Sequence, residues 1–205
     1  MNWNIKKKLI AASLGGSMLF GPGIGADHAY AKQDAQAVMR SDTAMEESEA
    51  VQRLKDAYAL QQHAEGGWFA EIYTSTFKQK ERSTAGSIYF LLDKGDISHF
   101  HQLDCDEIWY YHAGCGMKIT ILQDGKQRDV QLGVDTTKDE QPMVVIPAGA
   151  IFAAENIDKN SYTFISCATT PRFEYKGFRL VLRAELKKQY PALSASVLQM
   201  AYEKI

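Results

Sequence analysis

The chain has 205 residues, and its 23 basic and 25 acidic side chains give a formal net charge of −2. The basic residues are scattered along the chain, which argues against a nucleic-acid-binding protein. After the N-terminal segment, no apolar run reaches the length of a transmembrane helix. The composition therefore favours one ordinary domain that binds a small molecule or another protein.

The N-terminus has the pattern of a secretory signal peptide. Three lysines at 6–8 precede the uncharged apolar run of residues 9–20, and Ala29-Tyr30-Ala31 fits a signal peptidase site. The alternative is a buried N-terminal helix, which the lysines and the Ala-x-Ala pattern disfavour. We predict a signal peptide at 1–31, cleavage after Ala31, and a periplasmic or secreted protein.

The next two segments are predicted to be a leader and a helix. Residues 32–46 are polar and alanine-rich without apolar periodicity, so we expect a flexible leader. Val51, Leu54 and Tyr58 then recur at helical spacing. This pattern predicts a short amphipathic helix that stops near the glycines at 66–67, and a single domain over residues 47–205.

From residue 68 the apolar period changes to two, as in β-strands. Two segments, 98–103 and 106–112, are expected to pair as an antiparallel hairpin, and Asp124-Gly125 marks the turn of another. The tail after residue 186 is helical in composition and is broken at Pro191. We predict an all-β fold, either sandwich or barrel, with helices only at its ends. The predicted strands cover 68–77, 86–92, 98–103, 106–112, 117–122, 127–132, 141–147, 151–156, 161–170 and 178–186.

The three cysteines do not form a disulfide framework. Cys105 and Cys115 bracket a predicted strand at 107–112, whose ends lie about 20 Å apart. A disulfide requires Cα atoms within about 7 Å. Cys167 lies in an apolar strand pattern and is expected to be a buried thiol.

The stretch Ser98–Gly114, "SHFHQLDCDEIWYYHAG", carries the densest set of reactive side chains. His99 and His101 are two residues apart, so they share one face of a strand, and Glu107 follows in the next strand. Two imidazoles and one carboxylate are a plausible ligand set for Fe(II), Mn or Zn. The same pattern also fits polar side chains that hydrogen-bond one another around a wet pocket.

Six blocks in this order resemble the DUF985 family, also called cupin-5: "HAEGGWFAEIYTS", "RSTAGSIYFLL", "SHFHQLDCDEIWYYHAG", "LG", "VVIPAGAIFAAE" and "SCATTPRFEYKGFRL". The resemblance covers about residues 54–190. It implies a cupin jelly roll, in which two antiparallel sheets form a small β-barrel around a central pocket, and it implies a homodimer. Ala64, Gln102 and Tyr110 replace the proline, arginine and histidine usual in the family.

The general cupin motifs can be aligned with this chain by the resemblance. Of the four usual metal-ligand positions, His101 and Glu107 are retained, whereas the other two are occupied by Leu103 and Phe152. Leucine and phenylalanine cannot coordinate a metal. A site built from His99, His101 and Glu107 would have to shift along the strand, so we expect no tightly bound metal, with a divalent metal as the alternative.

The resemblance leaves three hypotheses for function. The first is an isomerase- or epimerase-like enzyme on a small molecule such as a sugar derivative, with His101 as base and Glu107 as its orienting group or acid. The second is a non-catalytic periplasmic ligand-binding or sensing domain. The third is a metal-dependent cupin enzyme that uses His99, His101 and Glu107. The expected ligand-binding residues are Glu65, Arg82, Tyr89, His99, Trp109, Tyr111 and Phe152.

Overall fold

The computed structural model describes residues 45–204. The predicted signal peptide and all but the last two residues of the predicted leader lie outside this range. Residues 45 and 46 already belong to a helix that runs over 45–57, so the helix begins earlier than the sequence pattern indicates. Among residues 45–204, no helix is long and apolar enough to span a membrane.

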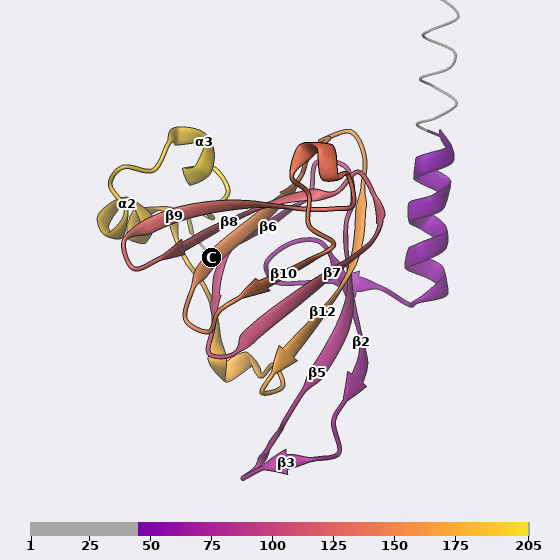
Figure 1. The fold of residues 1–205 in the computed structure, drawn as a ribbon, viewed down its shortest axis with the longest axis horizontal. Helices are drawn as coiled ribbons and strands as arrows, with labels where there is room; N and C mark the ends of the chain where they lie inside the picture. Colours follow the sequence, from indigo (N-terminus) through magenta and orange to yellow (C-terminus); the bar gives the residue numbers. More distant parts are fainter. Residues whose placement is uncertain (1–44, 205) are drawn as a thin grey trace, which may run out of the picture. The chain divides into compact units, whose positions relative to one another are not determined.

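Two antiparallel sheets make up most of the domain (Figure 1). The first sheet has the order β1 (Gln61–Gln62), β2 (Trp68–Thr74), β5 (Gly86–Leu92), β12 (Thr163–Thr170), β7 (Asp106–Gly114) and β10 (Met143–Ile146). The second has the order β13 (Phe178–Leu180), β6 (Ile97–Leu103), β11 (Ile151–Asn156), β8 (Met117–Gln123) and β9 (Lys126–Leu132). A short ribbon of β3 (Lys78–Gln79) and β4 (Arg82–Ser83) projects from the first sheet. This mostly β architecture confirms the predicted jelly-roll fold.

The main core lies between the two sheets. Phe90 and Trp109 come from the first sheet, Ile119 and Phe152 from the second, and all four side chains are buried in one apolar cluster. The period-two alternation of the sequence therefore reports which residues point inward, and burial of these large side chains drives the sheets together.

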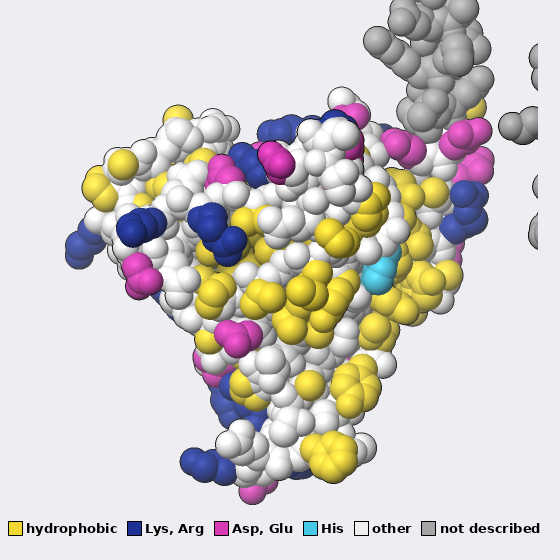
Figure 2. Space-filling view, in the orientation of Figure 1, with side chains coloured by type: hydrophobic (Ala, Val, Ile, Leu, Met, Phe, Trp, Pro, Cys, Tyr) yellow, Lys and Arg dark blue, Asp and Glu magenta, His cyan; other side chains and the backbone are white. Residues whose placement is uncertain are grey.

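Helices cover the outer faces of both sheets, on opposite sides of the domain (Figure 1). On the first sheet, Val51 of helix 45–57 packs with Leu91 and Phe164. On the second sheet, α2 (Arg183–Gln189) and α3 (Ala195–Leu198) pack against Phe100 and Ile151. Two short 3-10 helices, Thr136–Lys138 and Tyr175–Gly177, lie in connecting segments. Part of the first sheet's outer face stays uncovered and apolar around β10 (Figure 2).

The predicted hairpin of segments 98–103 and 106–112 is wrong. β6 pairs with β11 and β13, whereas β7 pairs with β12 and β10 in the other sheet. The turn at Asp104-Cys105 is therefore a corner that carries the chain between sheets. A short polar turn between two segments of alternating apolar residues has the same local sequence whether it closes a hairpin or carries the chain to the other sheet. The sequence pattern alone therefore could not distinguish a hairpin from a corner.

The predicted helix ends at residue 57 and not near the glycines at 66–67. The β8–β9 hairpin is confirmed, and Asp124 and Gly125 both have the positive φ angles of its turn, 51° and 72°. The strand predicted at 178–186 is wrong beyond Leu180, because α2 begins at Arg183. Cys105, Cys115 and Cys167 are free thiols, with Cys105 and Cys167 buried.

A glycine turn at residues 63–67 brings Glu65 under β6. The backbone N–H of His99 donates to the Glu65 carbonyl at 2.7 Å, and the N–H of His63 donates to the Gly67 carbonyl at 3.0 Å. Gly66 has φ of +102°, and a Cβ at this position would collide with the Ile97 carbonyl oxygen. Only glycine therefore lets the turn lie this close to the strand.

We predict that Gly66→Ala lowers the free energy of unfolding by at least twice as much as Gly95→Ala. Gly95 also has a positive φ, +75°, but has no atom within 4 Å of the added Cβ, so its replacement should cost only about 1–2 kcal/mol of backbone strain. Urea denaturation of both variants measures this difference. Equal losses would show that the turn is not held against β6.

Candidate functional site

A cavity of about 640 Å³ opens at one end of the domain, between the inner face of the first sheet and β6. Its lining comes from the turn at 63–67, from β2, β5, β6, β7 and β12, and from the loop at 172–176. Four buried polar side chains line its interior or lie at its wall: Glu65, His101, Glu107 and Cys167. A concave, largely apolar space with a few converging polar groups is the usual form of a small-molecule site.

Glu65 is the central acceptor of a buried hydrogen-bonding cluster. Its side chain receives a hydrogen bond from Ser98 Oγ to Oε1 at 2.8 Å, and its Oε2 lies 3.3 Å from both His63 Nδ1 and His101 Nε2. Burial opposes ionisation, but attraction to His101 and the contacts with His63 and Ser98 outweigh it and lower the pKa of Glu65. Glu65 is therefore a buried carboxylate at neutral pH.

His101 is held in one tautomer by the backbone. Its Nδ1 lies 2.7 Å from the His99 carbonyl oxygen, which can only accept, so Nδ1 carries a proton and Nε2 is the atom that faces Glu65. The ring packs on Phe152 with centroids 4.1 Å apart. Burial lowers the pKa of His101, while the Glu65 carboxylate acts in the opposite direction. The neutral imidazole thus presents an unprotonated Nε2.

Glu107 has the opposite ionisation state to Glu65. Its side chain is 7% exposed. Burial, reinforced by the negative charge of Glu65, raises the pKa of Glu107 to about 8, although Trp109 and Cys167 oppose this shift. Its Oε2 has no hydrogen-bond partner among residues 45–204. Glu107 is therefore a neutral carboxylic acid at pH 7.

Four of the predicted site residues meet at this cavity. Glu65, His101, Glu107 and Trp109 line it, and Phe152 lies behind the His101 ring. The partner of His101 is Glu65, because the Nε2 atom of His101 lies 3.3 Å from that carboxylate.

Four other predicted residues do not line the cavity. Tyr89 packs on Phe164 on the outer face of the sheet, with ring centroids 5.3 Å apart. The Tyr111 hydroxyl donates to the Gly114 carbonyl at 2.6 Å, and Arg82 forms a bidentate pair with Asp104 at 2.8 and 2.9 Å.

His99 also points elsewhere. Its Nδ1 lies 2.9 Å from the Met200 carbonyl oxygen, and its ring packs against Tyr202 with centroids 3.9 Å apart and the ring planes tilted by 33°. The C-terminal segment therefore occupies the side of β6 on which a third ligand was expected.

Comparison with known proteins agrees with the fold. Residues 52–181 match the Cupin_5 family, described as Cupin superfamily (DUF985). The chain belongs to the DUF985 family of cupins. It is similar to the structure of a protein from Shewanella oneidensis, with 33% identity, a TM-score of 0.70, and coverage of 74% of this chain and 96% of that one. No curated protein matches the chain.

Two further structures show how far the likeness extends. A hypothetical protein from Leishmania major is 31% identical, with a TM-score of 0.66 and coverage of 73% of this chain and 97% of that one. Oxalate decarboxylase from Bacillus subtilis is 14% identical, with a TM-score of 0.45 and coverage of 70% and 36%. This last likeness is too distant to bear on function.

Many cupins hold a metal ion, and the donor set of this DUF985 protein does not fit one. Leu103 and Phe152 stand at two of the four usual ligand positions, and the Nδ1 of His99 faces a backbone carbonyl. Within residues 45–204, no three His, Cys, Asp or Glu side chains are placed to hold a metal ion.

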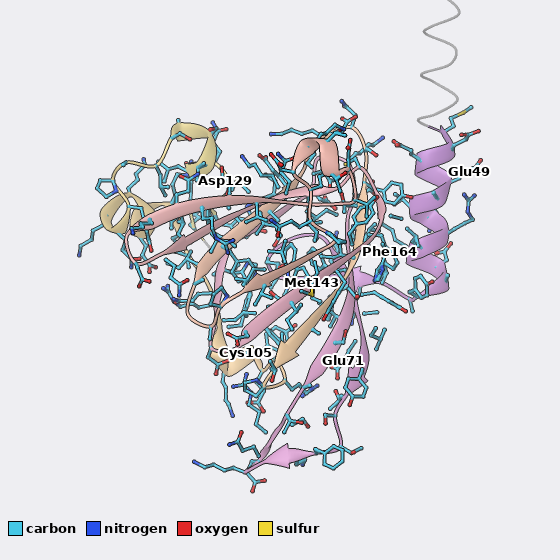
Figure 3. The ribbon with its side chains drawn as sticks, in the orientation of Figure 1. Glu49, Glu71, Cys105, Asp129, Met143 and Phe164 are labelled. Atoms are coloured by element: carbon cyan, nitrogen blue, oxygen red, sulfur yellow. The ribbon has the colours of Figure 1, made fainter. Side chains whose placement is uncertain are left out.

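Sequence reasoning missed the residues at the mouth of the cavity. His63 lies in an aromatic enclosure with Phe69 and Tyr175, and Arg172 forms a bidentate pair with Glu71, each N–O distance 2.9 Å. Figure 3 marks Glu71 on β2. The signal for His63 was its place two residues before Glu65 in a glycine turn. Arg172 follows β12, and no local pattern pairs it with β2.

We predict that Glu107→Gln changes how stability depends on pH. The carboxyl titrates at 4.5 in the unfolded chain and at about 8 in the fold, so the native state binds this proton more tightly and loses stability as pH rises from 4.5 through 8. The full loss is on the order of 5 kcal/mol, at about 1.4 kcal/mol per pH unit. Glutamine cannot titrate, so the variant should lack this loss.

Urea denaturation at pH 5 and pH 8.5 measures the free energy of unfolding of wild type and variant. The change between the two pH values is then compared for the two proteins. Glu81→Gln, on the exposed β3–β4 ribbon, is the control and should follow wild type. A Glu107→Gln variant with the pH dependence of wild type would show that Glu107 titrates normally.

Proposed function

We propose that this cavity catalyses proton transfer on a small polar molecule, as an isomerase or epimerase does. The supporting observation is that Glu65 and Glu107 line one cavity, with the pKa of Glu65 lowered and the pKa of Glu107 raised to about 8. Two carboxyl groups held in different ionisation states provide an acid, Glu107, and a carboxylate, Glu65, that supports a base beside it at the same pH.

The base in this proposal is Nε2 of His101. In the neutral ring this nitrogen carries the free lone pair of the imidazole, and an oxygen of the Glu65 carboxylate lies 3.3 Å from it. Glu65 therefore stabilises the imidazolium that forms when a C–H proton moves to His101. An interaction that strengthens as the reaction proceeds lowers the barrier.

The acid in this proposal is Glu107. When the C–H bond breaks, its electron pair moves into the adjacent carbonyl group, and the carbonyl oxygen gains negative charge. Glu107, neutral at pH 7, donates a hydrogen bond or its proton to that oxygen. Return of a proton to carbon, on the same or the neighbouring atom, regenerates both groups, so no oxidant or reductant is required.

The walls of the cavity support a small substrate with an apolar face, such as a sugar derivative. Phe69, Phe90 and Phe173 line it beside the buried polar groups. A non-catalytic binding domain would use the same cavity without proton transfer. The export predicted from the N-terminal segment and the homodimer implied by the family resemblance stay predictions, because the described residues belong to a single chain from residue 45 onward.

We predict that the purified protein exchanges a carbon-bound proton of its substrate with solvent. A panel of aldoses, ketoses and α-hydroxyketones in D₂O would be followed by the loss of α-C–H signals in ¹H NMR spectra. His101→Ala and Glu107→Gln should each slow exchange at least about 100-fold, the lower bound for a general acid or base. Exchange should decline above pH 8, as Glu107 ionises.

Tyr89→Phe, on the outer face of the sheet, is the matched control and should keep the wild-type rate. Exchange that survives His101→Ala would contradict the assigned base. Ligand-induced thermal stabilisation by members of the panel, with no exchange of any of them, would instead support the non-catalytic binding domain.

A further inference from the structure

We propose that His63 is a second catalytic base of the cavity, so that His101 and His63 act on opposite faces of one substrate carbon and invert it. The inference rests on the proposed proton-transfer function. It selects epimerisation, which inverts a stereocentre, over isomerisation, which moves a carbonyl group to a neighbouring carbon.

One carboxylate oxygen lies between the two imidazole rings. Oε2 of Glu65 is 3.3 Å from Nδ1 of His63 and 3.3 Å from Nε2 of His101, so these two nitrogens are at most twice that distance, 6.6 Å, apart. Both histidines line the cavity. Reacting atoms approach to about 3–3.5 Å, so one substrate carbon can lie within reach of both rings.

The contact with Glu65 decides which nitrogen of His63 is free. Burial raises the pKa of Glu65, but attraction to His101 and a hydrogen bond from His63 lower it overall, so the proton of the neutral His63 ring is on Nδ1. The backbone N–H of Glu65 lies 3.4 Å from the same nitrogen, and the charge-assisted bond to the carboxylate is the stronger contact.

Nε2 of His63 therefore carries the lone pair of the neutral ring. It makes no hydrogen bond within residues 45–204, and it is not among the fully buried atoms of that range that lack a partner. Because His63 lines the cavity, this nitrogen is open to a ligand there. A histidine with a carboxylate on Nδ1 and a free Nε2 is arranged as a general base.

Aromatic side chains hold the His63 ring in this orientation. Its centroid is 4.7 Å from that of Phe69, 5.7 Å from that of Phe178, and 6.3 Å from those of Phe173 and Tyr175. The His63 side chain is only 8% exposed. This enclosure restricts rotation of the ring, and its low polarity strengthens the interaction with the carboxylate.

The single carboxylate sets the proton balance of the pair. Glu65 can neutralise one imidazolium, and two imidazoliums would repel each other, so one ring is neutral while the other is protonated. With the substrate, neutral His101 removes the proton from carbon, and the C–H electron pair moves into the adjacent carbonyl group. Protonated His63 then gives its Nε2 proton to the opposite face, and the electron pair returns to form the new C–H bond.

This sequence inverts the carbon without an oxidant or a reductant. One proton has moved onto His101 and one has left His63, so the two rings have exchanged their protonation states. The reverse reaction starts from the epimer, with His63 as the base and His101 as the acid. Exchange of both rings with solvent restores the starting state.

The test separates exchange of the carbon-bound proton from inversion of the carbon. The probes are pairs of sugars that differ only at the carbon beside the carbonyl group: D-glucose and D-mannose, D-xylose and D-lyxose, and D-fructose and D-psicose. Each sugar would be incubated with the protein in D₂O. ¹H NMR follows the loss of the C–H signal, and chromatography measures formation of the epimer. Wild type should exchange and interconvert both members of at least one pair.

Substitution of each histidine should give opposite patterns of exchange. His63→Ala should exchange the substrate at the wild-type rate through His101, but should exchange its epimer at least about 100-fold more slowly. His101→Ala should show the reverse. Both variants should form the epimer at least about 100-fold more slowly, because the proton returns to the face that it left.

Two further variants separate chemistry from folding. His63→Gln retains an amide that can contact Glu65 but cannot transfer a proton, so it should behave as His63→Ala does, and added imidazole should restore inversion in His63→Ala. His112→Ala is the matched control and should keep every wild-type rate, because the His112 ring packs with Tyr89 and Phe164 on the outer face of the sheet.

The second base and the proposed function fail in different ways. Inversion at the wild-type rate in His63→Gln, loss of exchange of both epimers in His63→Ala, or exchange without inversion in wild type would each overturn the assignment of His63. Each of these results would leave proton transfer by His101 in place. A wild-type protein that exchanges none of these sugars would overturn both.

Discussion

Two carboxyl groups that share one desolvated cavity cannot both ionise without a large cost in electrostatic free energy. Burial opposes ionisation of Glu65, but attraction to the His101 ring when that ring is protonated, and the contacts with His63 and Ser98, lower its pKa, so the negative charge resides on Glu65. Glu107 lacks such partners on Oε2, so it keeps its proton. The two glutamates are chemically identical in the unfolded chain. Their different ionisation states are thus produced entirely by where the fold places them.

The placement depends on contacts between distant segments. Glu65 reaches the cavity because a glycine turn lies against β6, and His101 is oriented by the backbone carbonyl of His99 in the same strand. Glu107 comes from the opposite sheet, after the corner at Asp104-Cys105. The cavity therefore forms where the two sheets of the jelly roll meet, and a shift of either sheet would separate the acid from the base.

The sequence predicted the faces of the strands better than their partners. Alternation placed Glu107, Trp109 and Tyr111 on one face of β7 correctly. It could not show that the cavity covers only the first part of that strand, and Tyr111, which was expected to bind ligand, does not line it. His99 shares a strand face with His101 in the pattern, but the C-terminal segment that engages its ring lies about a hundred residues away. Contacts of that range leave no local signal.

A direct titration tests whether Glu107 is neutral at pH 7. The carboxyl carbons of ¹³C-labelled glutamates would be followed by NMR from pH 4 to pH 10, with Glu107→Gln and Glu65→Gln used for assignment. The Glu107 signal should titrate with a midpoint near pH 8, and the Glu65 signal should titrate below its ordinary value of 4.5. A Glu107 midpoint near 4.5 would contradict this prediction, because the cavity would then hold two carboxylates and no acid.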